Sequence, residues 1–422
     1  MTDIEIMSGE ETRHARALFE QLFAELSAIG LAPNGATTRL AWTVEAAQAA
    51  DWFDRTSGQL GLRVEVDRNG NRWAWAGNPA VGAITTGSHL DSVREGGRFD
   101  GALGVLSGLI AVHLLQRRGD LRAPMAVISF ADEEGGRYDT PTFGSRAMLG
   151  ALDVQAILER RDREGVTLGE ALAGAGLDPA AVGPDPERLC QIGAFVELHI
   201  EQDTLLTERE APLALGTQIL PHGRWRIDLH GEANHAGTTP LAIRRDPMLT
   251  LAVAIEAARR VAGEEGALAT IGKLEVSPNA TNAIAERVSL WLDVRAEDDA
   301  VIERTVQRIT DAVGADADAT GIGVEVKRES FTGAVRFSPR LRERVAQVLA
   351  AHGIEDVPMG TGAGHDAGAL AGAVPTAMLF VRSANGASHS SRELASVEDC
   401  VFGIGALAEV LAALSERVDE DG

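Results

Sequence analysis

The sequence predicts an α/β protein whose chain carries a second, smaller α+β domain as an insertion. Three observations lead to this prediction: the length of the chain, a β-α-β unit in its first third, and a β-α-β-β-α-β order further on. At 422 residues the chain is too long for one ordinary hydrophobic core, so two domains are expected. We place the larger domain at residues 1–214 and 331–422 and the inserted domain at residues 215–330.

Two helices are expected first, followed by the β-α-β unit. Apolar residues have a helical spacing over residues 12–29 and 41–60, and each stretch ends near a glycine. Residues 81–88 and 125–131 are apolar runs that predict buried strands, and the largely apolar residues 101–118 between them predict a helix. This order favours a parallel pair of strands within a larger sheet.

Two further strands of this sheet are predicted at residues 194–200 and 375–381. Histidine and acidic residues stand at or just after the ends of the predicted strands. Open α/β sheets place their functional sites at this edge, so we expect these side chains to converge there.

The inserted segment has a different order of elements. Its strand-like and helical stretches are, in chain order, residues 224–230, 246–261, 267–276, 287–295, 298–313 and 321–328. Pro247 stands in the first turn of the first helix, where proline is well tolerated. The order β-α-β-β-α-β is that of a ferredoxin-like domain.

Composition excludes several classes of function. The formal net charge of −23 argues against nucleic acid or an anionic membrane as a partner. No run reaches the ~18 apolar residues of a membrane span, and the acidic residues 1–5 do not resemble a signal peptide. The two cysteines lie far apart, which disfavours a disulfide framework and fits a reduced, cytoplasmic setting.

A run of three carboxylates, Asp132, Glu133 and Glu134, directly follows the predicted strand 125–131. Adjacent like charges repel and resist burial, so we expect positive charge beside them. Histidine and carboxylate ligands for two divalent cations are available near the other strand ends; with Glu134 they are His89, Asp100, His199 and His389.

Asp100 is the best candidate to bridge two cations, since each oxygen of one carboxylate can face a different ion. His89 and His199 would complete one group of ligands, and Glu134 and His389 the other. Mixed nitrogen and oxygen ligands suit Zn²⁺ and also tolerate Mn²⁺ or Co²⁺.

The remaining acidic residues can serve the chemistry. Two such cations would acidify a water molecule that acts as the nucleophile. Glu133 would be the general base, taking the proton and returning it to the leaving nitrogen. Asp91 is placed to orient the imidazole of His89. Taken singly, a histidine after a strand is more often structural, and a pair of glutamates is usually a solvated surface. Their coincidence at the strand ends of one domain makes a site for two metal ions about as well supported as these structural roles.

These motifs also resemble those of a known family, the dinuclear-metal amidohydrolases. The family includes N-carbamoyl-L-amino-acid hydrolase, β-ureidopropionase and allantoate amidohydrolase, within the aminoacylase and carboxypeptidase superfamily. The resemblance extends from about residue 35 to 405, with every motif in order: GSHLDSV at 87–93, GGRFDG at 96–101, EE at 133–134, HIEQ at 199–202, NHAGTTP at 234–240, GAGHDA at 362–367 and SH at 388–389.

The resemblance implies a metallopeptidase-like catalytic domain with a central mixed sheet and an inserted lid and dimerisation domain. It implies the same metal ligands and the same base, Glu133. His235 matches a histidine that reaches the neighbouring subunit's site and polarises the scissile carbonyl. Asn282 and Arg295 match groups that hold the substrate carboxylate, and Gln202 matches a side chain that contacts the ureido group.

Other interpretations of these substrate residues stay open. Arg295 could instead form a surface salt bridge with Asp293 or Glu297, His235 could be a plain loop residue, and Asn282 could be a turn former. Gly364 could offer a backbone donor to an anion or only form a turn. Arg382 could bind a second anionic group, although pairing with an acidic neighbour is slightly favoured.

We therefore expect a hydrolase that converts an N-carbamoyl amino acid into an amino acid, ammonia and carbon dioxide. The nearest alternative is an allantoate or other ureido-acid amidohydrolase; a dipeptidase or aminoacylase and a non-catalytic binding protein are more distant. The expected partners are a small-molecule carboxylate substrate and a second copy of the chain. Closure of the lid would use hinges near residues 214–218 and 329–334.

Overall fold

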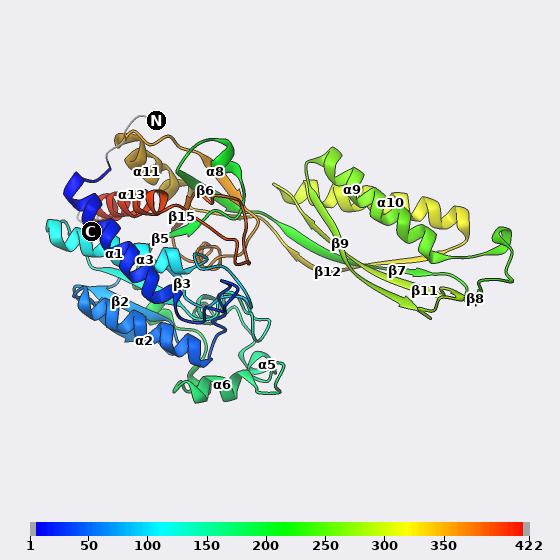
Figure 1. Cartoon of the computed structure of the whole chain (residues 1–422), viewed down its shortest axis with the longest axis horizontal. Helices are drawn as coiled ribbons and strands as arrows, with labels where there is room; N and C mark the ends of the chain where they lie inside the picture. Colours follow the sequence, from blue (N-terminus) through cyan, green and yellow to red (C-terminus); the bar gives the residue numbers. More distant parts are fainter. Residues whose placement is uncertain (1–5, 417–422) are drawn as a thin grey trace. The chain divides into compact units, whose positions relative to one another are not determined.

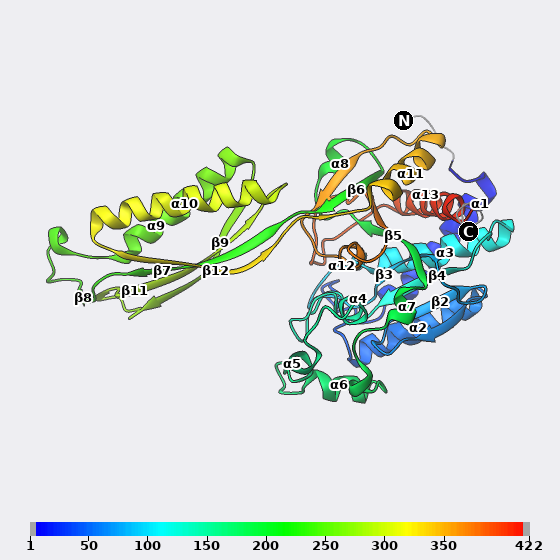
Figure 2. The same cartoon turned by 180° about the vertical axis from the view of Figure 1, so that it is seen from behind.

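The computed structural model describes residues 6–416, so the acidic N-terminal stretch 1–5 considered above lies outside the described residues. Contacts divide the chain into two compact units (Figures 1 and 2). Unit 1 comprises Met1–Gln218 and Arg336–Gly422, and unit 2 comprises Ile219–Val335. The boundaries lie a few residues beyond those that the sequence suggested.

Unit 1 is built on a nine-stranded sheet in the order β1-β2-β4-β3-β5-β15-β6-β13, with β14 paired to β6. β3, β4, β5 and β15 are mutually parallel, whereas β1, β2 and β6 pair antiparallel to their neighbours. The sheet is therefore mixed, as expected. The strands are β1 (Arg63–Val66), β2 (Arg72–Ala76), β3 (Ala83–His89), β4 (Met125–Phe130), β5 (Ile192–Ile200), β6 (Leu213–Ile219), β13 (Val335–Arg336), β14 (Pro358–Thr361) and β15 (Thr376–Val381).

One face of this sheet packs against the long helices of unit 1. Alternate strand residues point to it because successive side chains of a strand face opposite sides; on β5, Val196 and Leu198 join this core. The helices that contribute to the same core are α1 (Gly9–Ser27), α2 (Val44–Gln59), α3 (Ala102–Arg118), α11 (Pro339–Ala351) and α13 (Val397–Ser415). Glu197 and His199 consequently project from the other face of β5.

α3 is the helix that positions the site. It begins after Gly101, whose φ of 64° is in the left-handed region, and ends at Gly119, which caps it with φ 74°. Almost all of its side chains are buried, which explains why its sequence is apolar on every side rather than along one stripe.

Six short helices in the described part of unit 1 were not predicted from the sequence, and the first three of them, α4 to α6, pack in a second apolar cluster. Each has only a few residues, too few for a periodic pattern to show. They are α4 (Phe143–Met148), α5 (Val154–Leu158), α6 (Leu168–Gly174), α7 (Pro186–Leu189), α8 (Leu205–Glu208) and α12 (Asp366–Leu370). The β1–β2 hairpin was also missed.

Unit 2 has the predicted ferredoxin-like order. Its four-stranded antiparallel sheet runs β12-β7-β11-β9, and both helices lie on one face of it (Figure 1). A second, two-stranded sheet pairs β8 with β10. The elements are β7 (His222–His230), β8 (Asn234–His235), α9 (Pro247–Glu265), β9 (Leu268–Ser277), β10 (Ala283–Ile284), β11 (Arg287–Arg295), α10 (Asp299–Thr320) and β12 (Gly323–Thr332).

α10 continues beyond residue 313, where the sequence suggested that it ends. Val313 and Ala317 are both buried against the sheet, and Gly321 caps the helix in the left-handed conformation. Packing against the sheet thus keeps the chain helical at Gly314, although glycine inside a helix costs about 1 kcal/mol relative to alanine.

Two composition-based expectations can be compared with the described residues. Both cysteines are free, Cys190 exposed and Cys400 buried, as the spacing predicted. Within residues 6–416, no helix has the length and apolar character that a bilayer crossing requires.

Candidate active site

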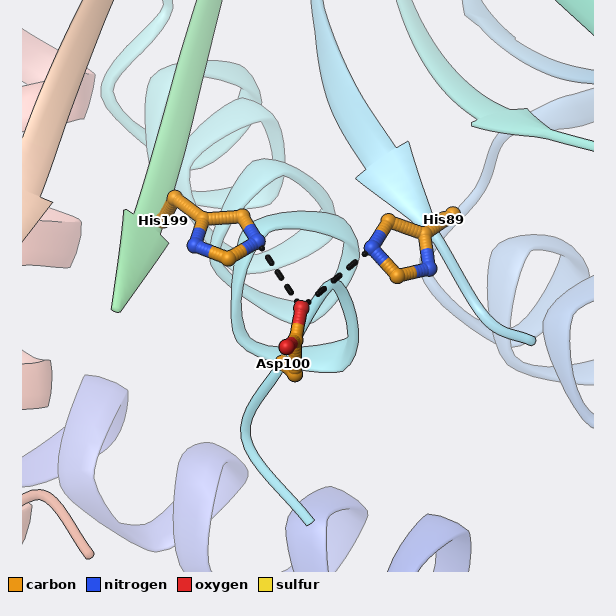
Figure 3. A group of neighbouring side chains, drawn as sticks. All are labelled: His89, Asp100 and His199. Carbon is orange, nitrogen blue, oxygen red and sulfur yellow. Dashed lines mark ion pairs between the residues drawn. The ribbon is translucent and has the colours of Figure 1, made fainter. Parts of the chain in front are cut away.

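Two strand ends and the start of α3 bring three predicted ligands together in unit 1 (Figure 3). His89 is the last residue of β3, and His199 is the penultimate residue of β5. Nε2 of His199 lies 3.1 Å from Oδ1 of Asp100, and Nε2 of His89 lies 3.5 Å from the same oxygen. All three side chains are buried. They form the first candidate group of ligands for a cation.

The second candidate group shares Asp100 and adds Glu134 and His389. Nε2 of His389 lies 3.5 Å from Oδ2 of Asp100 and 3.4 Å from Oε2 of Glu134. The His389 side chain is 51% exposed, whereas the two carboxylates are buried almost completely. Asp100 thus turns one oxygen toward each group, which is the geometry that a bridging carboxylate requires.

Backbone carbonyls orient both buried histidines. Nδ1 of His89 lies 3.1 Å from the carbonyl oxygen of Asp91, and Nδ1 of His199 lies 2.9 Å from that of Ile200. With Nδ1 donating to a carbonyl, Nε2 is the nitrogen that faces Asp100 and is available to a cation.

Asp91 orients His89 mainly through its backbone, which refines the expectation for this residue. Its carboxylate lies 3.5 Å from the imidazole, farther than its carbonyl. The carboxylate instead accepts the backbone N–H groups of Glu133, at 3.2 Å, and Glu134, at 3.1 Å. One residue therefore fixes both the imidazole and the paired glutamates.

Glu133 lies beside the first group without belonging to either. Its Oε2 is 3.7 Å from Nε2 of His89, and the side chain is buried. Burial raises the pKa of Glu133 well above its usual value, and the neighbouring carboxylates Asp366, Glu134 and Asp91 add to this effect. Such a carboxyl group takes up a proton more readily than an exposed one.

The ligand carboxylates differ in their electrostatics. Burial raises the pKa of Glu134 to about 8, with a further contribution from Asp100. Burial acts in the same direction on Asp100, but the neighbouring imidazoles of His199 and His89 outweigh it and hold its pKa well below the usual value. The centre therefore favours positive charge between the imidazoles and Asp100, which a cation can supply.

The residues present fit bound cations. A Cβ at Gly101 would lie 2.4 Å from Nε2 of His89, so only glycine keeps that nitrogen accessible. Oε1 of Glu134 is buried and, among the described residues, receives no hydrogen bond. An acceptor atom of this kind is costly to bury unless an ion or a donor satisfies it.

A third combination, Glu197, His199 and His365, is less suited to a cation. The oxygens of Glu197 already accept hydrogen bonds from Ser88 Oγ, at 2.7 Å, and from the N–H of Ala367, at 3.0 Å. His365 packs edge-on against His199, with 4.5 Å between ring centroids. We assign this combination a structural role.

Two buried charged residues beside the centre were missed by the sequence analysis. Glu393 accepts the backbone N–H groups of Phe99 and Asp100, at 2.7 and 3.0 Å. Arg39 is fully buried; burial lowers its pKa to about 10, although Asp91, Glu393 and Asp100 act in the opposite direction. Neither stands in a motif, because their partners are backbone groups far away in the sequence.

The other predicted residues of unit 1 have varied surroundings. Nε2 of Gln202 donates to Oδ2 of Asp100 and to Oγ of Ser388, both at 2.9 Å, so it contacts the second group directly. Gly364 lies in the turn after β14, where a Cβ would meet no atom within 4 Å. Arg382 forms a two-pronged ion pair with Asp399, at 2.9 and 3.0 Å, as the favoured interpretation had it.

Three predicted substrate residues lie in unit 2, and the structure brings two of them together. The N–H of Ala236 donates to the carbonyl oxygen of Asn282 at 3.0 Å, so His235 and Asn282 lie side by side. Nδ1 of His235 accepts the N–H of Gly237 at 3.1 Å, which leaves Nε2 as a donor on an exposed ring. Arg295 ends β11, where its Nε donates to Asp293 at 3.1 Å.

Comparison with known proteins identifies the relationship. The sequence pattern of peptidase family M20/M25/M40 matches residues 85–413. The chain belongs to this family. The N-carbamoyl-L-amino acid amidohydrolase of Geobacillus stearothermophilus is 37% identical over 398 residues, which cover 93% of this chain and 95% of the relative.

Other relatives of this M20 family member are also named as amidohydrolases or amidases. The allantoate amidohydrolase of Bacillus subtilis is 32% identical over 400 residues, covering 92% of this chain and 95% of the relative. A crystal structure of a hydantoinase/carbamoylase family amidase from Burkholderia ambifaria superposes with a TM-score of 0.84 at 32% identity, covering 94% of this chain and 96% of that one. This M20 family member is thus a metal-binding amidohydrolase, which cleaves carbon–nitrogen bonds other than peptide bonds.

Proposed function

We propose that the protein hydrolyses the ureido group of an N-carbamoyl amino acid, using two divalent cations. One water is consumed, and the products are the amino acid, ammonia and carbon dioxide. The observation that carries the proposal is Asp100, whose Oδ1 faces His89 and His199 while Oδ2 faces His389. Zn²⁺ suits this mixed set of ligands, and Mn²⁺ or Co²⁺ would also be accepted.

The two groups of ligands would hold the cations, which would supply Lewis acidity toward the water and the ureido oxygen. Glu133 then takes the proton of the attacking water and delivers it to the leaving nitrogen. Its support is geometric: Asp91 fixes the backbone of Glu133, and the carboxylate lies beside His89 but outside both groups. A buried carboxyl with a raised pKa is suited to hold that proton between the two steps.

We assign substrate binding to residues of both units. Gln202 and the backbone at Gly364 would contact the ureido group and an anionic group of the substrate. Arg295 and Asn282 would bind its carboxylate, since a guanidinium and a carboxylate match as planar partners. His235 would donate from Nε2 to the developing oxyanion, an interaction worth about 3 kcal/mol in other hydrolases.

The geometry of unit 2 supports a homodimer. His235 and Asn282 lie near the Arg287 end of β11, because β8 and β10 adjoin that end of the sheet, whereas Arg295 is at the opposite end. A strand of nine residues spans about 27 Å at ~3.4 Å per residue. One small substrate cannot contact both ends, so we propose that His235 and Asn282 act on the partner subunit's substrate and Arg295 on its own.

An exposed apolar face on α9 also favours association of unit 2 with a second copy. Leu249 and Ile255 are 64% and 47% exposed, and Met248 is exposed beside them. Contiguous apolar surface on a helix commonly marks an interface. We place the hinges of lid closure at the two chain crossings between the units, near residues 218–219 and 335–336.

Allantoate is the second candidate substrate, and the 32% identity to an allantoate amidohydrolase favours it specifically. The same ligands and base would act on its ureido group. Dipeptide or N-acyl amino acid hydrolysis is a more distant candidate, and binding without turnover is the remaining one.

A substrate screen tests the proposal. The metal-free protein, loaded with Zn²⁺, Mn²⁺ or Co²⁺ in turn, is assayed with N-carbamoyl amino acids, allantoate, N-acetyl amino acids and dipeptides. We expect ammonia release from N-carbamoyl amino acids, and only when a cation is present. A higher kcat/KM on allantoate would move the assignment to the second candidate, and amine release from dipeptides without ammonia would refute both.

A further inference from the structure

Glu393 connects two loops that carry ligands. It lies four residues after His389, and its buried carboxylate accepts the N–H groups of Phe99 and Asp100 through a single oxygen, Oε2. These are backbone bonds to the candidate bridging ligand and to the residue before it. Rotation of the loop 96–101 would break both bonds.

Gly97 makes room for this carboxylate. A Cβ at position 97 would lie 2.1 Å from Oε2 of Glu393 and 2.7 Å from its Cβ, distances that real atoms do not tolerate. The φ of Gly97 is outside the left-handed region, so its backbone does not require glycine. Position 97 therefore requires glycine because a larger residue would clash with Glu393.

The loop that carries His389 is held compactly around Glu393. The N–H of Glu393 donates to the carbonyl of Ser390 at 3.1 Å, and the side chain of Asn385 donates to the carbonyl of Arg392 at 2.7 Å. His389 itself has a φ of 53°, an unfavourable value for a residue with a Cβ, so this loop must hold it in place.

The first group of ligands does not depend on this loop for its histidines. His89 and His199 end buried strands and donate to their own carbonyl partners. His389 is half exposed and has no strand behind it. Loss of Glu393 should therefore affect the second group more than the first.

We propose that Glu393 is a positioning residue that fastens the His389 loop to the Asp100 loop and so sets the affinity of the second group for its cation. The proposal rests on the assignment of two cations made above. Neighbours of this kind, which orient a ligand without touching the metal, typically change metal affinity about 10- to 100-fold when removed.

The test is a titration of metal-free protein with Co²⁺ alone, followed by calorimetry and by the visible absorption of the ion. The variants are Glu393→Ala, Gly97→Ala, the double variant and Glu393→Gln. Gly58→Ala is the matched control, since a Cβ at this helical glycine meets no atom within 4 Å. Thermal unfolding of each metal-free variant shows whether it is folded.

We expect wild type to bind two ions, and Glu393→Ala to bind one of them about 10- to 100-fold more weakly while the other is retained. Gly97→Ala should have the same effect, because it displaces the carboxylate without removing it. The double variant should be no worse than either single one, since both act on one contact. Glu393→Gln should stay near wild type, because its amide oxygen can accept the same two N–H groups.

Unchanged binding of both ions in Glu393→Ala and Gly97→Ala would overturn the inference while leaving the proposed function intact. An equal loss in Gly58→Ala would also overturn it, as would additive losses in the double variant. If Glu393→Ala does not fold, Gly97→Ala is compared with Glu393→Gln. Weaker binding of one Co²⁺ in Gly97→Ala alone then supports the inference, and unchanged binding of both ions in Gly97→Ala overturns it. Wild type that binds no Co²⁺ would instead refute the two-cation assignment and the inference with it.

Discussion

Single residues at the site act through the space they leave as much as through their charge. Gly101, with a φ of 64°, leaves Nε2 of His89 open, and Gly97 admits the carboxylate of Glu393. Asp91 holds an imidazole with its carbonyl and two glutamate N–H groups with its carboxylate. The candidate ligands and the candidate base are thus placed by neighbours that lie outside both groups of ligands.

The roles of the two adjacent glutamates can be separated by substitution. Glu133→Gln should lower kcat about 10²- to 10⁴-fold, as removal of a general base does, while the metal content stays near wild type. Glu134→Gln is its matched control and should lose part of the metal, because Glu134 lies in the second group of ligands. Metal analysis by mass spectrometry with steady-state kinetics measures both; metal loss in Glu133→Gln with residual turnover would reverse the two roles.

The sequence allowed His89, Glu134 and His199 to be named because they stand at or just after the ends of predicted strands. Asp100 and His389 lie farther from a strand and were named from the motifs GGRFDG and SH. The structure gathers His89, Asp100 and His199 at these strand ends and brings Glu134 and His389 to the second oxygen of Asp100. Glu393 and Arg39 were not predictable in this way. Their partners are backbone groups and distant charges, which leave no local pattern.

At the scale of elements, the neighbouring strands β7 and β11 each place an arginine beside Asp293. Arg295 on β11 and Arg224 on β7 both donate to Asp293, each at 3.1 Å. Removal of either arginine therefore costs Asp293 one ion pair, which makes Arg224 a close control for Arg295.

Arg295→Ala should lower kcat/KM for carboxylate substrates about 10- to 100-fold, mainly through KM, since hydrogen bonds to charged groups contribute about 1.5–3 kcal/mol. Arg224→Ala should stay near wild type, because the loss of an exposed salt bridge costs little. Steady-state kinetics of both variants decides the matter; equal effects would show that Arg295 is only a partner of Asp293.

The contact between α1 and α3 predicts a pH dependence of stability. Nε2 of His113 lies 3.5 Å from Nε2 of His14, and burial, together with the charges of His14 and Arg117, lowers the pKa of His113. The folded protein therefore binds fewer protons here than the unfolded chain, so this stabilisation is present above the ordinary histidine pKa and is lost as pH falls through the lowered value.

His113→Gln should remove that dependence. The melting temperature of wild type should fall more than that of the variant between about pH 7.5 and pH 5. Calorimetry of the metal-free proteins at both pH values measures the two melting temperatures. An equal fall in wild type and in His113→Gln would show that His113 is not the source of the pH dependence.

In unit 2, elements with strong periodicity were predictable from the sequence; in unit 1, the helices α11 and α13 were not predicted. β7, β9, β11 and the helix α9 follow their apolar patterns, whereas α10 extends through Gly314 because Val313 and Ala317 pack on the sheet. The short helices of unit 1 have no pattern of their own. Among them, α4, α5 and α6 pack in the apolar cluster around Phe143 and Leu168.

At the scale of the whole molecule, the proposal that His235 serves the partner's site predicts complementation. Glu133→Gln and His235→Ala should each be nearly inactive alone. In a mixed dimer, the subunit with intact Glu133 receives His235 from its partner, so one of its two sites is complete. Random mixing makes half of the dimers mixed, and about a quarter of wild-type activity should return.

The measurement is the activity of the two variants after joint refolding or coexpression, compared with each alone. No recovery would mean that His235 acts within its own chain or has no part in catalysis. Mixing Glu133→Gln with Glu134→Gln serves as the control, since both changes inactivate unit 1 of their own subunit and leave no complete site in a mixed dimer.

The architecture could be predicted as two domains because the order of elements changes within the chain. Their boundaries could be placed only approximately, because β6 continues past residue 214 before the chain enters unit 2. Continuous pairing in the sheet, rather than composition, decides where such a strand ends.

The chain leaves unit 1 along β6 and returns along β13, and these two strands are neighbours in the same sheet. A tight hairpin of a few residues would bridge the same gap. Evolution can therefore exchange or enlarge the inserted domain, and so change the range of substrates, while the candidate metal ligands and the base remain in unit 1.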